Sequence, residues 1–154
     1  MSDFIYIAAP FRGASKEEVA FNVARAAALG RVAALQGHLP FVPHLCIGGL
    51  FEYDDATYRE ESLKLGIAWL DKLLCSGARA QFWLLEKDEG GRSAGCSEEL
   101  SYCVKAAPEG RASGLHIWLS REWPQWYGAF KEVGLLDLWE SLLMAPPSTP
   151  GAQT

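Results

Sequence analysis

The sequence predicts an α/β protein, built as one parallel sheet of four to five strands with helices on both faces. The first observation is a set of short apolar runs, rich in β-branched and aromatic residues, at 3–9, 39–43, 80–85 and 115–119. The second is that helical stretches separate these runs. Strands that alternate with helices form parallel sheets whose two faces the helices cover.

The predicted helices have recognisable ends. Residues 15–18 (Ser-Lys-Glu-Glu) form a capping box, in which the Ser15 hydroxyl accepts a hydrogen bond from the Glu18 N–H. The Ala-rich run that follows reaches about Gln36, and Gly37 occupies the position that favours glycine after a helix. Further helices are predicted over 56–74, with Gly77 just beyond, and over 100–107.

The remaining segments complete a single domain over residues 1–143. Residues 44–53 contain Gly48-Gly49 and are predicted as a loop over the edge of the sheet. Residues 123–143 are aromatic and helical, with divisions at Pro124 and Gly134. Residues 144–154 are rich in proline and small residues and are predicted to form a disordered tail.

Composition narrows the class of protein. The 154 residues are 49% hydrophobic and 21% charged, which is typical of a globular domain with a real core. A net charge of -5 argues against a general nucleic-acid binder. No apolar run approaches the roughly 20 residues of a membrane span. The four cysteines form no Cys-x-x-Cys pair and no signal peptide is recognisable, so free thiols and a cytoplasmic location are predicted.

The most informative segment is 92–99 (Arg-Ser-Ala-Gly-Cys-Ser-Glu-Glu), which lies between a predicted strand and a predicted helix. Open α/β sheets bind ligands at such a junction. Ser93 and Gly95 allow a hydroxyl and backbone N–H groups to approach an anion. Glu99 lies about one turn inside the helix and can point over the same place, with Glu98 as the alternative carboxylate. The segment therefore predicts an anion cradle beside a carboxylate.

Three pieces together resemble the nucleoside 2-deoxyribosyltransferase-like superfamily. They are 5–13 (Ile-Tyr-Ile-Ala-Ala-Pro-Phe-Arg-Gly), 37–45 (Gly-His-Leu-Pro-Phe-Val-Pro-His-Leu) and Ser93-x-Gly95-x-x-x-Glu99. The resemblance covers roughly residues 3–120. Within the superfamily, the chain is most similar to the nucleoside 5′-monophosphate N-glycosidase branch and to small uncharacterised bacterial and phage proteins. It implies a Rossmann-like (flavodoxin-type) fold and cleavage of the bond between a sugar C1′ and a nucleobase.

The resemblance also implies roles for residues. It makes Glu99 the nucleophile and Tyr6 the residue that orients it, and it places the 5′ end of the nucleotide on Phe11, Arg12 and Gly13. The residue types suit this chemistry, because a carboxylate beside C1′ stabilises an oxocarbenium-like state and becomes covalently linked in retaining enzymes. A phenol that donates to the carboxylate fixes its rotamer and keeps it ionised.

Ser93 bears on the choice of substrate. Deoxyribosyltransferases resemble Asp-x-Gly-x-x-x-Glu here, with the Asp meeting a free 5′-hydroxyl. A carboxylate repels a phosphate, whereas the Ser93 hydroxyl can donate to one, and Arg12 and Arg92 are near in sequence. A 5′-monophosphate is therefore the favoured substrate, although the acidic loop 86–91 beside this place counts against it.

A second catalytic acid is harder to find. Family members often carry an acidic residue just before the third strand, where this chain has Ala78-Arg79-Ala80. Asp71 on the preceding helix is the first candidate, with Asp54 and Asp55 behind it. A domain that lacks this acid could also bind a nucleotide without turning it over.

Two further residues are candidates for substrate contacts. His44 follows the second strand and either lines the pocket or caps a loop. Arg59 either contacts the ligand or forms part of a solvated helix face with Glu60 and Glu61. No metal-ligand spacing links the three histidines, so no metal is predicted, and carboxylate chemistry requires no organic cofactor.

The predicted function is hydrolysis of the base–sugar bond of a (deoxy)nucleoside 5′-monophosphate. The alternatives are a nucleoside 2-deoxyribosyltransferase acting on free nucleosides and a non-catalytic nucleotide-binding module. The partner is a small-molecule nucleotide, without nucleic acid or membrane. The resemblance implies a homodimer or higher homo-oligomer. Most of the six tryptophans are expected in the core. The alternative for one aromatic group is a subunit interface, where such residues are enriched: Trp123, Trp126, Tyr127 and Phe130.

Overall fold

The computed structural model describes residues 2–11, 15–47, 56–85, 94–106, 116–119 and 123–143. Its centre is a parallel sheet with the strand order β2-β1-β3-β4. The strands are β1 (Phe4–Ala8), β2 (Leu39–Phe41), β3 (Ala80–Leu84) and β4 (His116–Leu119). Tyr6 of β1 lies in register with Phe41 of β2 and with Phe82 of β3. The prediction of an α/β protein with a parallel sheet is confirmed.

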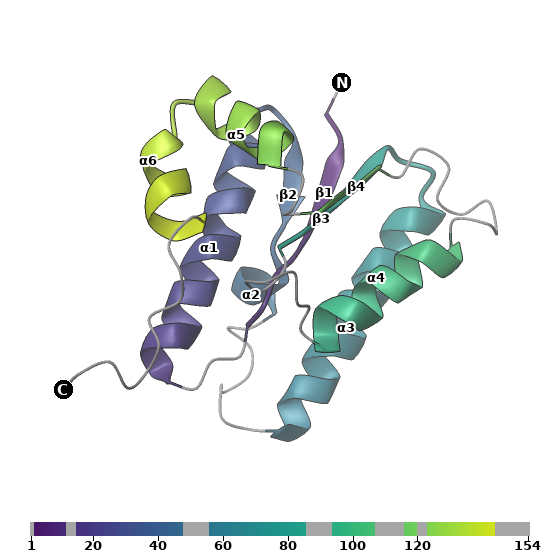
Figure 1. The fold of residues 1–154 in the computed structure, drawn as a ribbon. Helices are drawn as coiled ribbons and strands as arrows, with labels where there is room; N and C mark the ends of the chain where they lie inside the picture. The colour runs from purple at the N-terminus through teal and green to yellow at the C-terminus, as the bar shows by residue number, and fades with distance from the viewer. Residues whose placement is uncertain are drawn as a thin grey trace.

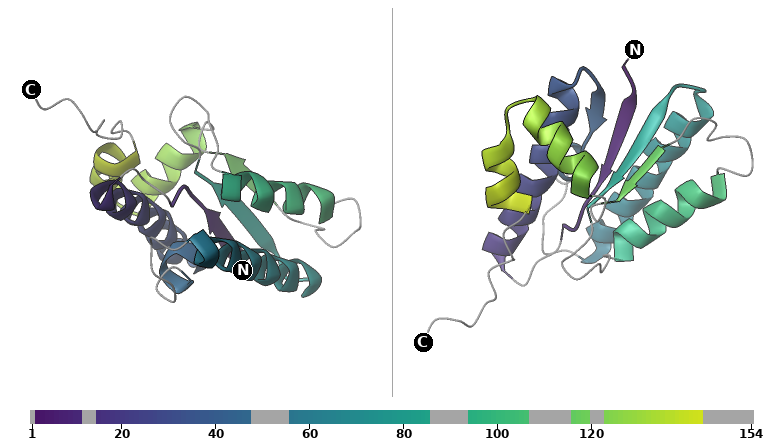
Figure 2. Two further views of the ribbon diagram at one scale, coloured as in Figure 1. Left: turned by 90° about the horizontal axis from the view of Figure 1, so that it is seen from below. Right: turned by 45° about the horizontal axis from the view of Figure 1, so that its top comes forward.

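Side chains alternate between the two faces of the sheet, as the period of a strand requires. One face carries Ile5 and Ile7 and packs against α1 (Lys16–Leu35), α5 (Trp123–Glu132) and α6 (Leu136–Leu138). The opposite face carries Tyr6 and Ala8 and packs against α3 (Ala56–Cys75) and α4 (Ala94–Ala106). Figures 1 and 2 show α1, α5 and α6 on one side of the sheet and α3 and α4 on the other.

The predicted ends of the helices at 15–36 and 56–74 are confirmed to within a residue. Ser15 caps α1, because its hydroxyl accepts the backbone N–H of Glu18 at 3.1 Å. Gly37, Gly77 and Gly134 follow α1, α3 and α5 with φ values of +83°, +71° and +75°. Such left-handed values strain residues that carry a Cβ, so glycine fits at these three places.

Three predicted boundaries are corrected. The helix expected over 100–107 is α4, which already begins at Ala94 and so takes in most of the polar segment expected as a loop. Part of the expected loop at 44–53 is helical, because Pro43–Cys46 form α2 with Pro43 in its first turn, where the fixed φ of proline suits a helix. Pro124 lies in the first turn of α5 and does not divide the helix, whereas Gly134 does separate it from α6. The chain then ends its described part in the π-helix η3 (Trp139–Leu143).

The predicted aromatic subunit contact is wrong for two of its residues. Trp126 and Phe130 are buried inside the chain, where Trp126 packs edge-on against Trp83 at 5.1 Å between ring centroids and Phe130 packs against Trp139 at 5.3 Å. Their apolar area is covered by this protein's own core. Tyr127 on the outer side of α5 is 45% exposed, and the side chain of Trp123 lies outside the description.

Some predictions fall on segments outside the described residues, including the disordered tail at 144–154 and the glycines at 48–49. All four cysteines are free, with Cys96 and Cys103 buried in the core beneath α4. Within the described ranges, no helix has the length and apolar character needed to cross a membrane.

Candidate functional site

A buried hydrogen bond joins the two residues that the sequence singled out as nucleophile and orienting phenol. The Tyr6 hydroxyl of β1 donates to Oε1 of Glu99 in α4 at 2.6 Å, across 93 positions of the chain. Glu99 is 8% exposed and Tyr6 is 1% exposed. The parallel strands bring the end of β3 beside β1, so the helix that follows β3 carries Glu99 over the centre of the sheet.

Burial controls the protonation of both members of this pair. It raises the pKa of Glu99 to about 7, although the hydrogen bond from Tyr6 acts to lower it, while the nearby Glu98 raises it further. Burial and the adjacent Glu99 carboxylate together raise the pKa of Tyr6 well above its usual value of 10. Tyr6 therefore remains a proton donor in a hydrogen bond, and Glu99 titrates near neutral pH.

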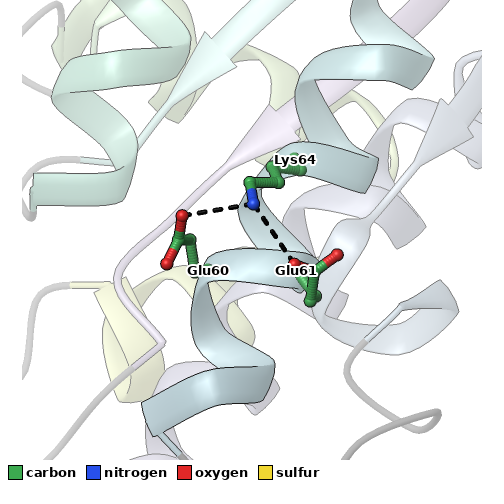
Figure 3. A network of polar contacts seen from close by, with 3 residues as sticks. All are labelled: Glu60, Glu61 and Lys64. Atoms are coloured by element: carbon green, nitrogen blue, oxygen red, sulfur yellow. Dashed lines mark hydrogen bonds and ion pairs between the residues drawn. The ribbon is translucent and has the colours of Figure 1, made fainter.

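The hydrogen bond with Tyr6 distinguishes Glu99 from the neighbouring Glu98. Glu98 is exposed on the outer side of α4, while Glu99 faces the sheet. Glu60 and Glu61 of α3 are exposed as well. One carboxylate oxygen of each residue, Oε1, forms an ion pair with Nζ of Lys64 at 3.2 Å (Figure 3). These two carboxylates form a solvated helix face, as one reading of the sequence predicted, and such exposed pairs contribute little to stability.

Gly66 of α3 is the residue of this site that sequence reasoning missed. A Cβ added at Gly66 would lie 2.7 Å from the Tyr6 hydroxyl oxygen and 3.4 Å from Oε1 of Glu99. The backbone of α3 therefore covers the pair from one side. A signal was present in the sequence, because a glycine inside a helical run costs about 1 kcal/mol relative to alanine and often marks close packing.

His44 and Phe11 meet beyond the end of β1. The ring of His44 contacts Phe11 edge-on at 4.9 Å between centroids, and its Nε2 lies 3.1 Å from the carbonyl oxygen of Pro10. Because a carbonyl only accepts, Nε2 carries the proton and Nδ1 is an acceptor. Nδ1 is buried and has no hydrogen-bond partner among the described residues. Burial lowers the pKa of His44 to about 4, so the ring is neutral at physiological pH.

Asp71, the first candidate for a second catalytic acid, has a hydrogen-bond partner of its own. It lies on α3 and accepts a hydrogen bond from the Tyr102 hydroxyl of α4, and the thiol of Cys75 lies 3.8 Å from the same oxygen. Neither Tyr6 nor Glu99 is among its hydrogen-bond partners in the described residues. Asp71 thus links the two helices that enclose the Tyr6–Glu99 pair.

Other predicted contacts are only partly described. Gly95 lies in the first turn of α4, where a Cβ would make an ordinary contact with Leu63 at 3.8 Å. Arg12, Gly13 and Ser93 lie outside the described residues, as does the side chain of Arg59. No group of three or more His, Cys, Asp or Glu side chains in the described ranges is arranged to hold a metal ion.

Buried Cys103 is a poor candidate for a nucleophile. Burial, with the nearby Glu99, raises the pKa of its thiol to about 12, so almost no thiolate forms at neutral pH. Cys103 lies in the same buried core cluster as Tyr6 and Phe82. Glu99, in contrast to Cys103, ionises near neutral pH.

Comparison with protein families gives one match. A family model described as a domain of unknown function, DUF7768, matches residues 3–110. This segment extends from β1 to the end of α4 and so includes Tyr6, Gly66 and Glu99. Neither a curated protein nor a solved structure matches the chain.

We expect Glu99→Gln to stabilise the protein above neutral pH. The pKa of Glu99 is about 7 in the folded protein against an ordinary 4.5, so the folded state holds a proton that the unfolded chain releases in this window. The free energy of unfolding therefore falls as pH rises from 4.5 to 7, and the ionised carboxylate costs about 3 kcal/mol above pH 7. Urea unfolding at pH 8 measures the gain. Glu98→Gln removes the same charge from an exposed position and should change little.

We expect His44 to contribute the opposite dependence. The folded pKa of about 4 lies below the ordinary 6.5, so the unfolded chain binds more protons in between, and the free energy of unfolding rises with pH through this window. Glu99 and His44 largely cancel between pH 4.5 and 6.5. Urea unfolding should therefore show a rising profile for Glu99→Gln, a falling one for His44→Gln and a flat one for the double variant. Parallel profiles for the two single variants would contradict this.

Proposed function

We propose that this chain, which belongs to the DUF7768 family of domains of unknown function, hydrolyses the N-glycosidic bond of a (deoxy)nucleoside 5′-monophosphate with Glu99 as nucleophile. The observation that carries the proposal is the buried hydrogen bond from Tyr6 to Glu99. The resemblance to the nucleoside 2-deoxyribosyltransferase-like superfamily supplies the substrate class. The contact between these two residues supports the proposal, because the resemblance gives Tyr6 the role of orienting Glu99.

The two oxygens of Glu99 take different roles in the proposed reaction. Oε1 is held by Tyr6, and within the described part of the chain Oε2 has no such partner. Oε2 attacks C1′ of the sugar, the bond from C1′ to the base nitrogen breaks, and the base leaves with the electron pair and takes up a proton. A glycosyl ester of Glu99 remains. While the bonds at C1′ form and break, the carboxylate stabilises the positive charge that develops there.

Water completes the hydrolysis. Its oxygen attacks C1′, the ester bond to Glu99 breaks, and the electron pair returns to the carboxylate while one proton of the water is released. The products are the free base and the sugar 5-phosphate. Tyr6 keeps its proton in both steps, because its raised pKa makes it a donor only, and it holds the rotamer of Glu99 throughout.

The phosphate site is proposed at the carboxyl edge of the sheet. Phe11 follows β1 and Gly95 lies in the first turn of α4, and parallel strands bring these two places to one edge of the sheet. Arg12 and Gly13 adjoin Phe11 in the sequence, and Ser93 precedes α4, so we propose that they complete the phosphate site. Backbone N–H groups at a helix N-terminus favour anions there. His44 beside Phe11 is neutral at physiological pH, so it supplies hydrogen bonding and the positive charge falls to Arg12.

The proton donor for the leaving base is a separate question. Asp71 is bonded to Tyr102 and suits a structural link between α3 and α4 better than an acid at the base. Asp54 and Asp55 lie outside the described residues and become the leading candidates. Arg59, at the start of α3, belongs with them as a candidate contact to the base.

The proposal extends to fold class, assembly and location. The strand order β2-β1-β3-β4 supports a Rossmann-like, flavodoxin-type sheet, in which ligands bind where the order reverses beside the first strand. Exposed Leu65 and Trp69 on α3 support a homodimer or higher homo-oligomer. Four free thiols support a cytoplasmic location.

Base release tests the function directly. We expect chromatography to show a free base from at least one of a panel of ribo- and deoxyribonucleoside 5′-monophosphates, and Glu99→Gln to lower the rate by several orders of magnitude. Glu98→Gln is the matched control and should retain activity. Release from free nucleosides alone, with transfer to an added base, would replace hydrolysis by a deoxyribosyltransferase. No release, with a raised melting temperature in one nucleotide, would indicate a binding module.

The pH profile tests the role of Tyr6. We expect kcat/KM to fall about tenfold per pH unit below pH 7, because only ionised Glu99 is nucleophilic and its pKa is about 7. Tyr6→Phe removes the hydrogen bond that lowers this pKa, so its acid limb should move upward by about 1 pH unit. Measurement of kcat/KM from pH 5 to 9 decides this. A limb that stays in place would show that Tyr6 does not set the ionisation of Glu99.

A further inference from the structure

We infer that Gly66 is a positioning residue, whose missing side chain leaves the space in which the Tyr6 hydroxyl reaches Glu99. The inference rests on two short distances. A Cβ built at Gly66 would lie 2.7 Å from the hydroxyl oxygen of Tyr6 and 3.4 Å from Oε1 of Glu99. Real Cβ atoms do not approach an oxygen to 2.7 Å, so any side chain here displaces one of its neighbours. The consequence for catalysis rests on the proposed function, whereas the positioning itself does not.

The ring of Tyr6 cannot move aside. It lies between Phe41 and Phe82, its register partners in β2 and β3, with 5.6 Å between ring centroids on each side. Tyr6 is 1% exposed and Phe82 is fully buried. Interiors packed at this density transmit strain rather than absorb it, so a displaced hydroxyl has no nearby space to occupy.

The helix α3 is also held in place. Leu70 and Leu74, one and two turns beyond Gly66, are buried in the core under α3. Asp71 accepts the Tyr102 hydroxyl and so ties α3 to the helix that carries Glu99. With both sides fixed, a methyl group at position 66 must act on the contact between them, which is the Tyr6–Glu99 hydrogen bond.

The expected consequence is specific to this hydrogen bond. A methyl group would push the Tyr6 hydroxyl away from Oε1 and would add apolar surface beside the carboxylate. Both changes disfavour ionised Glu99, so its titration should move above its present midpoint of about 7. At pH 7 a shift of 1 unit would cut the ionised fraction from a half to about a tenth, a loss of about fivefold that higher pH restores.

The test is a double-mutant cycle between Gly66→Ala and Tyr6→Phe. Gly66→Ala should lower the midpoint of urea unfolding in the unaltered protein. In the Tyr6→Phe background the oxygen at 2.7 Å is absent, so the same substitution should leave the midpoint unchanged or raise it. Gly128→Ala in α5 is the matched control, because nothing lies within 4 Å of its Cβ and helix propensity alone should make it mildly stabilising in both backgrounds.

A second measurement needs no substrate. The carboxyl carbon of Glu99, followed by NMR across pH 4 to 10, should titrate at higher pH in Gly66→Ala than in the unaltered protein and unchanged in Gly128→Ala. An equal effect of Gly66→Ala in both Tyr6 backgrounds, together with an unmoved Glu99 titration, would overturn the inference. Because neither readout requires turnover, a failure of the proposed glycosidase activity would leave this result separate and interpretable.

Discussion

The hydrogen bond between Tyr6 and Glu99 is the interaction on which the rest of the site depends. It places a carboxylate in a position that is almost closed to water, where an unpaired charge is costly. One hydrogen bond offsets only part of that cost, and the pKa of Glu99 therefore stays near neutral instead of returning to its ordinary value. Sheet, helix α3 and helix α4 all converge here, so the pair is held by three elements that are distant in sequence.

Two ionisable groups, the buried Glu99 and the partly buried His44, give this region an unusual electrostatic character. Glu99 resists ionisation and His44 resists protonation, and both effects arise mainly from loss of hydration. Between the ordinary and folded pKa values, the two groups oppose one another in the stability of the fold. Packing alone does not explain why these two groups are present, since neutral side chains of similar shape would avoid the cost in stability that their lost hydration causes. Groups kept at a cost in stability are typical of functional sites, where activity and stability are in tension.

The helices α3 and α4 carry two phenol–carboxylate contacts with different surroundings. Tyr6 meets Glu99 under the helices in a buried place, while Tyr102 meets Asp71 between them in a partly exposed one. The carboxylate of the first contact has lost most of its hydration, and this burial raises the pKa of Glu99 to about 7. The second contact fixes how the helices lie beside one another. Gly66 completes the arrangement, because the backbone of α3 can approach the buried pair only where a side chain is missing.

Local signals determined much of this protein by themselves. The Ser15 cap, the glycines after α1, α3 and α5 and the apolar runs of β1 and β3 each act over a few residues, and a sequence shows them directly. The sequence also nominated Tyr6 and Glu99, through spacing within two motifs. The tertiary structure decided that Glu99 and not Glu98 faces the sheet, that Asp71 bonds to Tyr102, that Trp126 packs inside, and that Gly66 lies against the pair. These depend on helix rotation and on contacts between segments 30 to 90 residues apart, which no local pattern encodes.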